Sequence, residues 1–220
     1  MSRRYETNWE GFQFFGKMSA SISHEIKNTL SIINETAGLL EDLVFLAEKG
    51  KPLDQERLKT MAQRIMRQVH RADEIVKNLN KFAHSVDRQV KSVDLDETLE
   101  LVLALSGRFA SMRGVTMELE PCSDRVAITT IPFFLNNLLW LCMDFAMKAT
   151  ERGGTVRLII EQTKNGPRIR FTRLEGLVEA PMDEFQGAWG KALLDMLEAE
   201  ITADTEAAEL ILSLQKNIGP

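Results

Sequence analysis

The sequence predicts an α+β protein in which a long antiparallel helical hairpin is followed by an α/β sandwich. Three observations support this fold class. Apolar residues recur every three, four and seven positions up to about residue 85, which indicates amphipathic helices. Beyond that point, segments typical of helices and of strands alternate. The chain has 220 residues, 44% hydrophobic and 27% charged, which suits two globular domains, and we place these at residues 1–88 and 89–220.

The first helix of the predicted hairpin runs from about residue 9 to residue 47, and the second runs from Asp54 to about residue 85. Gly50 and Pro52 separate them. The apolar stripes consist of Phe15, Met18, Ile22, Ile26, Ile33, Ala37, Leu40 and Val44, and of Leu58, Ala62, Ile65, Val69, Ala72, Val76 and Leu79. Because a lone hairpin cannot cover its apolar seam, we expect two copies to form a dimeric four-helix bundle. Closure of the bundle by the rest of the same chain is the alternative.

The second half alternates between helix and strand patterns. Helices are predicted at residues 95–113, 131–150 and 186–198, and the first of these begins near Asp96. Strands are predicted at residues 115–120, 125–129, 155–162, 168–173, 200–203 and 209–214. Asn165 and Gly166 join two of them as a hairpin. The pattern predicts one mixed or antiparallel sheet with helices on one face.

Charge and composition exclude several classes of function. The formal net charge of −5 gives no basic footprint for a nucleic acid. Cys122 and Cys142 are too few for a disulfide framework and lack the spacing of metal ligands, so we predict no metal site. No apolar run is long enough for a signal peptide or a membrane span. We therefore expect a cytoplasmic protein that contacts neither membrane nor nucleic acid.

Of the three histidines, His24 has the most informative neighbours. Ile22 and Ile26 belong to the apolar stripe, so His24 is expected to project from the flank of the bundle. Asn28 follows one turn later and shares its face. With Ser31 and Glu35 these two residues form a polar ridge beside the apolar stripe. The residues predicted to dock a partner along this ridge are Lys27, Ser31, Ile32 and Glu35.

The side chains around His24 suit reversible chemistry at a phosphorus atom. A neutral imidazole nitrogen is a nucleophile near neutral pH, and the adjacent Glu25 could orient the ring or accept its proton. Asn28 could hydrogen-bond a phosphoryl oxygen or position a water molecule, and Lys27 could supply positive charge. On spacing alone, an exposed His-Glu pair on a helix is more often a solvated face without any chemistry.

The segment from Phe15 to Ile33, FGKMSASISHEIKNTLSII, resembles the phospho-acceptor motif of two-component sensor histidine kinases. In that family the motif reads Ser-His-Glu, two residues, Thr or Asn, and then usually Pro-Leu, and here Thr29 stands in place of the proline. The resemblance implies that His24 is phosphorylated, that Glu25 is the base that activates it, and that Asn28 positions water in the dephosphorylation of a response regulator. The end of the second helix is also similar to the family, and neither of the other two histidines is expected to take part in the chemistry.

The second half resembles the ATP-binding domain of the same family, but its hallmark positions differ. Phe145 stands in place of the metal-binding asparagine, and a phenyl ring cannot ligate magnesium. Arg173 stands in place of the aspartate that accepts a hydrogen bond from adenine, and arginine has no acceptor. The sequence Ala188-Trp189-Gly190 replaces the start of the glycine-rich phosphate loop. Together these changes leave little with which to position a γ-phosphoryl group.

The resemblance and these departures from it favour a histidine phosphotransferase. We expect a homodimer that exchanges phosphate between His24 and response-regulator aspartates and that needs no nucleotide or other cofactor. One alternative is a divergent ATP-dependent sensor histidine kinase or phosphatase, which would need ATP and magnesium. Another is a non-catalytic interaction module that regulates a kinase and in which His24 is idle.

Overall fold

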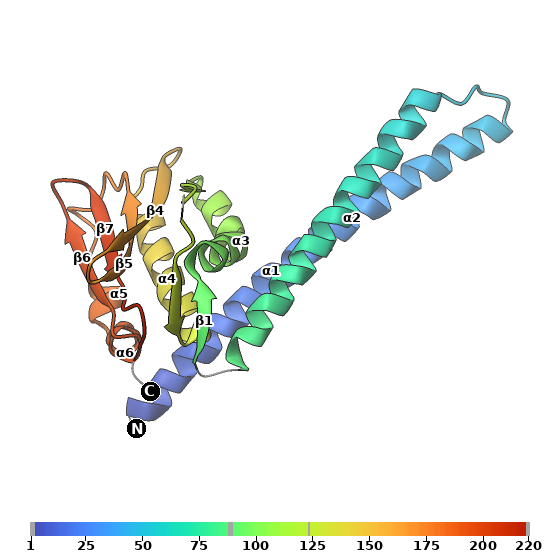
Figure 1. Cartoon of the computed structure of the whole chain (residues 1–220). Helices are drawn as coiled ribbons and strands as arrows, with labels where there is room; N and C mark the ends of the chain where they lie inside the picture. Colours follow the sequence, from blue (N-terminus) through green and yellow to red (C-terminus); the bar gives the residue numbers. More distant parts are fainter. Residues whose placement is uncertain (1–2, 88–89, 123, 219–220) are drawn as a thin grey trace. The chain divides into compact units, whose positions relative to one another are not determined.

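The computed structural model describes residues 3–87, 90–122 and 124–218. Contacts divide the chain into two compact units (Figure 1). The first, the hairpin unit, comprises Ser19–Asn80, and the second, the mixed unit, comprises the residues before Ser19 and after Asn80. The predicted boundary between residues 88 and 89 lies outside the described residues.

The two long helices of the predicted hairpin are confirmed as α1 (Arg3–Glu48) and α2 (Gln55–Ala83). Asp54 starts α2, because its Oδ1 accepts hydrogen bonds from the backbone N–H groups of Glu56 and Arg57 at 3.0 and 3.2 Å. Within the hairpin unit the buried residues of α1 are Ser21, Ile22, Thr29 and Thr36, and that of α2 is Met61.

Thr29 shows how the helix accommodates a residue where a proline was expected from the family motif. Its side chain is 1% exposed, and its hydroxyl donates a hydrogen bond of 3.0 Å to the backbone carbonyl of Glu25. A buried hydroxyl is thereby satisfied within its own helix. Because no proline interrupts the backbone, α1 continues through this point without a break in its helical assignment.

The mixed unit contains two sheets, so the prediction of a single sheet is wrong in this respect. The larger has the order β2-β4-β5-β7-β6, with β2 parallel to β4 and the other neighbours antiparallel. Its strands are β2 (Thr116–Leu119), β4 (Thr155–Thr163), β5 (Gly166–Thr172), β6 (Glu200–Asp204) and β7 (Glu209–Ser213). The smaller sheet pairs β1 (Lys91–Asp94) with β3 (Ala127–Thr130). β1 was not predicted, because four residues with a single apolar side chain carry no strand pattern until a partner pairs with them.

The helices of the mixed unit are α3 (Leu95–Arg113), α4 (Pro132–Lys148), α5 (Asp183–Gln186) and α6 (Ala188–Met196), and the short 3₁₀ helix η1 (His84–Val86) follows α2. Helix α3 begins close to the predicted Asp96, and its cap is Asp94, because the Asp94 carboxylate accepts hydrogen bonds from the backbone N–H groups of Asp96 and Glu97. Gly114 ends α3 with φ 67°, a left-handed conformation that favours glycine. Asp183–Gln186 was not predicted as a helix.

Helix α4 forms the centre of the core of the mixed unit and contacts β5 and β7 on one face of the larger sheet (Figure 1). Its side chains with 0% exposure are Leu135, Leu138, Leu139, Cys142, Met143 and Ala146. Strand alternation places Ile169 and Phe171 of β5 in the core, and both have 0% exposure. This confirms the α+β fold class, with helices packed on one face of a mixed sheet.

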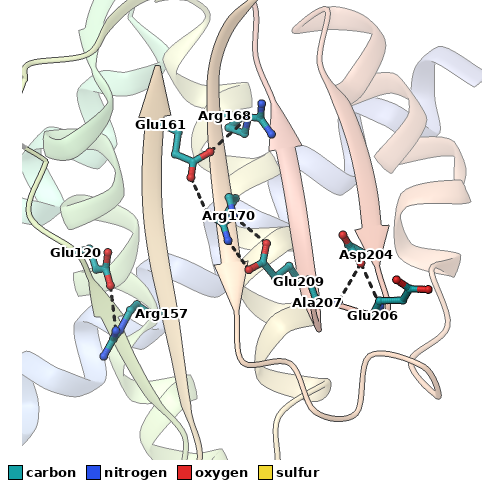
Figure 2. Close-up of polar contacts among 9 residues, drawn as sticks. All are labelled: Glu120, Arg157, Glu161, Arg168, Arg170, Asp204, Glu206, Ala207 and Glu209. Atoms are coloured by element: carbon teal, nitrogen blue, oxygen red, sulfur yellow. Dashed lines mark hydrogen bonds and ion pairs between the residues drawn. The ribbon is translucent and has the colours of Figure 1, made fainter. Parts of the chain in front are cut away.

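The opposite face of the sheet carries ion pairs that cross between strands (Figure 2). Arg170 of β5 lies between two carboxylates: its Nη1 is 2.6 Å from Glu161 Oε1 on β4, and its Nε is 2.8 Å from Glu209 Oε2 on β7. The hydrogen bonds that the Arg170 guanidinium donates to Glu209 and Glu161 raise its pKa. Arg157 similarly meets Glu120 at 3.0 Å. Cross-strand pairs of opposite charge stabilise a sheet whose other face is apolar.

The first turns of α1 belong to the mixed unit and contact its aromatic residues. The Phe14 ring lies 5.5 Å from that of Phe82 and 6.0 Å from that of Phe133. Lys17 Nζ lies 4.5 Å from the ring centre of Trp140, a cation–π contact. Among the described residues, none of the helices combines the length and the apolar character needed to cross a membrane.

Candidate phospho-acceptor site

The site is built on α1, where His24 has an exposed side chain. Its helix presents Ile22, 5% exposed, and Thr29, 1% exposed, to the interior of the hairpin unit. Successive helical residues are about 100° apart, so a residue two positions after Ile22 points well away from the core. The amphipathic pattern of α1 therefore places the imidazole in solvent on an ordered helix.

One side chain holds the imidazole in place. The Nδ2 atom of Asn28 lies 3.2 Å from Nδ1 of His24, one helical turn earlier. This spacing follows from the geometry of an α-helix, in which residues four apart are neighbours. Within residues 3–87, 90–122 and 124–218, no hydrogen-bond partner is recorded for the other ring nitrogen, Nε2.

Glu25 and Lys27 flank the histidine without contacting its ring. Glu25 is half-buried, and in the described part of the chain its carboxylate makes no recorded hydrogen bond or ion pair with His24. Its backbone carbonyl accepts the hydroxyl of Thr29. Lys27 is exposed. The structure thus brings Asn28 to the imidazole and leaves the carboxylate of Glu25 to one side of it.

The predicted docking ridge continues along α1. Ser31 and Glu35 are exposed and Ile32 is half-buried. Glu35 also meets Arg64 of α2, with 3.7 Å between Oε2 and Nη2. The sequence analysis did not identify Arg64, because the register of one helix against the other is not visible from the periodicity of either helix.

A separate face of the hairpin unit is apolar and uncovered. Its five large side chains are each at least 42% exposed: Leu30, Val44, Met66, Val69 and Val76. Leu30 lies six positions after His24 and therefore about 120° around α1 from it. The hairpin thus has three distinct faces, namely its interior, the polar ridge and an uncovered apolar face.

In the mixed unit, the residue that the sequence resemblance aligns with a magnesium ligand is Phe145. Its side chain is 2% exposed, and its ring lies 5.5 Å from the Phe185 ring at an interplanar angle of 63°. Phe185 belongs to the short helix α5. An edge-to-face pair of aromatic rings therefore packs at the position where the resemblance would place an oxygen ligand.

The carboxylate next to Phe145 is already paired. Asp144 Oδ1 lies 2.9 Å from Arg113 Nη1, and its Oδ2 lies 2.8 Å from Lys148 Nζ. Burial alone would raise the pKa of Asp144, but hydrogen bonds from Lys148 and Arg113 outweigh it and hold the pKa below its ordinary value. Lys148 also binds Glu184 of α5, so the two cations tie α4 to its neighbours.

The other positions that the resemblance aligns with nucleotide motifs are Arg173 and the segment Ala188-Trp189-Gly190. Arg173 is exposed and has a left-handed backbone with φ 67°. The Trp189 ring lies 6.2 Å from that of Phe134, and a Cβ on Gly11 would lie 3.5 Å from it. A Cβ on Gly190 would lie 2.3 Å from the backbone carbonyl oxygen of Glu184, so a close backbone approach explains this glycine. Across the described ranges, His, Cys, Asp and Glu form no cluster of three or more that could hold a metal ion.

Residues 16–86 match the family model of the His Kinase A (phospho-acceptor) domain. None of the curated proteins matches the chain. The histidine kinase AdeS of Acinetobacter baumannii is similar in structure, with 16% identity over 89% of this chain and 98% of AdeS and a TM-score of 0.46. A bacterial phosphotransferase has 16% identity, coverage of 93% and 96%, and a TM-score of 0.48. The histidine kinase ThkA, solved in complex with the response regulator TrrA, has 18% identity, coverage of 97% and 66%, and a TM-score of 0.46.

The family match spans both helices of the hairpin, and it includes His24, Asn28 and the apolar positions that set their exposure. Residues 16–86 therefore form a domain of the His Kinase A (phospho-acceptor) family.

Proposed function

We propose that this protein is a histidine phosphotransferase. His24 accepts a phosphoryl group from the aspartyl phosphate of one response-regulator receiver domain and passes it to the aspartate of another, without a nucleotide. One observation carries the proposal: an exposed, oriented imidazole lies in the same chain as an ATP-binding-type half whose magnesium-ligand position is a buried phenyl ring.

The transfer at His24 needs only an accessible nitrogen lone pair. The ring nitrogen attacks phosphorus, an N–P bond forms, and the O–P bond to the aspartate breaks as the carboxylate leaves. The reverse step starts from a receiver carboxylate and regenerates the imidazole. Lys27 is exposed on α1, three residues after His24, and supplies positive charge near the transferred group.

The residues of the mixed unit do not fit a magnesium nucleotide. Magnesium requires oxygen ligands in a near-octahedral arrangement, and Phe145 offers none. The adjacent Asp144 carboxylate is neutralised by two cations, Arg113 and Lys148, and lies on another side of the helix. Arg173 cannot accept a hydrogen bond from an adenine amine. These features favour a transferase over a divergent ATP-dependent kinase.

The partners follow from the two solvent-facing sides of the hairpin unit. The polar ridge of Lys27, Ser31, Ile32 and Glu35 lies beside His24 and is the proposed docking site for a receiver domain. The uncovered apolar face carries Leu30 and Val69, which a second copy of the hairpin would bury in a four-helix bundle. The proposed functional form is therefore a homodimer with one receiver site per histidine.

The test uses the purified full-length chain, its His24→Ala variant and a His70→Ala variant as the matched control, since His70 is also exposed. Each is incubated with γ-labelled ATP and magnesium and, separately, with receiver domains labelled beforehand on their aspartate. We expect no label from ATP, and label from a receiver domain in the wild type and His70→Ala but not in His24→Ala. Label taken directly from ATP would show a kinase, and no label from any receiver domain would favour a non-catalytic interaction module.

A further inference from the structure

Strand β2 lies at one end of the larger sheet, with β4 as its neighbour. We propose that the free edge of β2, together with a groove between β2 and α3, is a docking site for an extended segment of a partner protein. The side chains of this segment alternate between small apolar residues and lysine or arginine. Such a site gives the mixed unit a function that needs neither a nucleotide nor the chemistry of His24.

The free backbone groups of β2 follow from its pairing with β4. The N–H groups of Thr116 and Glu120 donate to backbone carbonyls on the β4 side, at 3.0 and 2.9 Å. Because successive residues of a strand direct their N–H and C=O groups to opposite sides, Met117 and Leu119 direct theirs away from β4. In the described ranges, no backbone bond outside the β2–β4 ladder is recorded for these two residues. The edge therefore offers two donors and two acceptors to an added strand.

The side chains of the same two residues lie on the apolar face of the sheet, next to the groove. Met117 and Leu119 are the ladder partners of Val156 and Leu158, which both have 0% exposure. The groove has a volume of about 530 Å³, and none of the residues that line it is charged. Small residues of α3 form much of its wall, namely Ser106, Gly107, Ala110 and Ser111. A strand added to β2 directs every second side chain toward this groove, which has room for small apolar groups.

The opposite face of the β2 edge is acidic. Glu120 and Glu118 both meet Arg157 of β4, at 3.0 and 3.8 Å, and the first of these pairs is drawn in Figure 2. Their side chains are 41% and 52% exposed. Two carboxylates thus share one guanidinium, which leaves one negative charge unbalanced. The alternate side chains of an added strand lie on this face, where a lysine or arginine forms a cross-strand pair with Glu118.

The charge of the edge disfavours a second copy of this chain as the occupant. When the outward-facing residues Met117 and Leu119 of two copies pair with each other, Glu118 lies directly opposite Glu118. Like charges in this position destabilise a sheet. The strand at the other end of the sheet, β6, carries Glu200 and Asp204. Both edges that a second copy could offer are therefore acidic, and charge complementarity favours a basic segment of a different protein.

A short synthetic peptide that alternates lysine and valine is the probe. It carries a fluorescent label, and its binding to the full-length protein is followed by fluorescence anisotropy. One control peptide has glutamate in place of lysine, and a second keeps the lysines but has its backbone nitrogens methylated. We expect both controls to bind about tenfold or more weakly than the probe, because one loses the charge pairs and the other loses the backbone hydrogen bonds.

A charge reversal on the protein locates the peptide. Glu118→Lys should weaken binding of the lysine–valine peptide by about tenfold, because an attractive cross-strand pair becomes repulsive. Glu200→Lys is the matched control, since it makes the same change at an exposed residue of the opposite edge strand. It should bind the peptide as the wild type does. Equal binding by Glu118→Lys and Glu200→Lys would overturn the proposal.

Amide hydrogen exchange, followed by NMR, gives a readout that charge attraction alone does not change. In the free protein the amides of Met117 and Leu119 should exchange faster than that of Glu118, which faces β4. Bound peptide should slow exchange at Met117 and Leu119 by about tenfold or more and leave Glu118 nearly unchanged. No binding, or binding without this alternation, would overturn the proposal. Protection of Met117 and Leu119 that rises with protein concentration in the absence of peptide would overturn it in favour of a second copy.

Discussion

The hairpin unit and the mixed unit differ in where their family-motif positions lie. In the hairpin, the motif side chains of His24 and Asn28 are in solvent and contact each other. In the mixed unit, Phe145, which only the sequence resemblance aligns with a motif position, is buried against Phe185. A polar group in solvent is available for chemistry, whereas an apolar group in a core contributes to stability. The two units therefore differ in that the exposed pair of the hairpin unit is accessible to a partner, whereas Phe145 of the mixed unit contributes to packing.

The largest expected effect comes from restoring the family residue in the mixed unit. Phe145→Asn removes a buried ring and leaves an amide among apolar neighbours, so we expect a loss of about 3–5 kcal/mol in the free energy of unfolding. We also expect no gain in binding of a fluorescent ATP analogue. Urea denaturation and fluorescence titration measure the two quantities.

The matched control for this change is Phe12→Asn, because Phe12 is 72% exposed. An exposed substitution of this kind should change stability by about 0.5 kcal/mol or less. Tight nucleotide binding by Phe145→Asn would contradict the view that the Phe145 position serves packing only. It would mean that a single residue separates the mixed unit from a working nucleotide site.

The second prediction concerns the uncovered apolar face of the hairpin unit. Leu30→Asp places a charge where the proposed second copy would bury a leucine, and burial of such a side chain is worth about 1.5–3 kcal/mol. We expect a clear rise in the dimer dissociation constant, measured by sedimentation equilibrium, with α-helical content unchanged. Asn28→Asp adds the same charge at an exposed residue on the opposite side of α1, about 160° around the helix from Leu30, and should leave the dissociation constant as in the wild type. An unchanged mass for Leu30→Asp would place any self-association elsewhere.

The sequence predicted the two units unequally, for physical reasons. The long helices of the hairpin follow from a periodicity sustained over many turns, so α1 and α2 were placed closely. The four-residue strand β1 and the short helix α5 were missed, because each depends on a tertiary partner more than on its own pattern. The sheet β1-β3 could not be separated from the main sheet for the same reason.

The candidate site shows a similar limit. Helical spacing was sufficient to predict that Asn28 shares a face with His24, because residues four apart are neighbours on any α-helix. It was not sufficient to decide between Glu25 and Asn28 as the partner of the ring, which depends on side-chain rotamers. The pairing of Glu35 with Arg64 was missed because it depends on the register between two helices.

The third prediction uses the ion pairs beside Phe145. Asp144→Asn removes the carboxylate shared by Arg113 and Lys148, and we expect a loss of about 1–3 kcal/mol in the free energy of unfolding at neutral pH. The folded pKa of Asp144 is lowered, so its ionised form stabilises the fold above the unfolded pKa, near 3.9, and this contribution is lost as the pH falls through the folded value. The wild type should therefore lose stability below about pH 4 more steeply than Asp144→Asn.

Asp195→Asn serves as the control for this pH dependence, since it is the same substitution at an exposed position of α6. Its acid-denaturation profile should follow that of the wild type. Parallel profiles for Asp144→Asn and the wild type would mean that the paired carboxylate does not stabilise the mixed unit. The stability of this region would then depend on the Phe145–Phe185 pair and not on the ion pairs beside it.

The smallest expected effect is at the ion pair between the proposed docking ridge and α2. Arg64 and Glu35 are 3.7 Å apart, with side chains 44% and 65% exposed. Because such pairs contribute about 0–1 kcal/mol, Arg64→Ala should scarcely change the urea midpoint. It frees Glu35 for a receiver domain without altering it, so any change in the rate of transfer from a labelled receiver reports docking alone. A loss of more than about 1 kcal/mol in the free energy of unfolding would show that the ridge contributes to the packing of the hairpin. The distinction between an exposed docking surface and a stabilising core would then not hold in the hairpin unit.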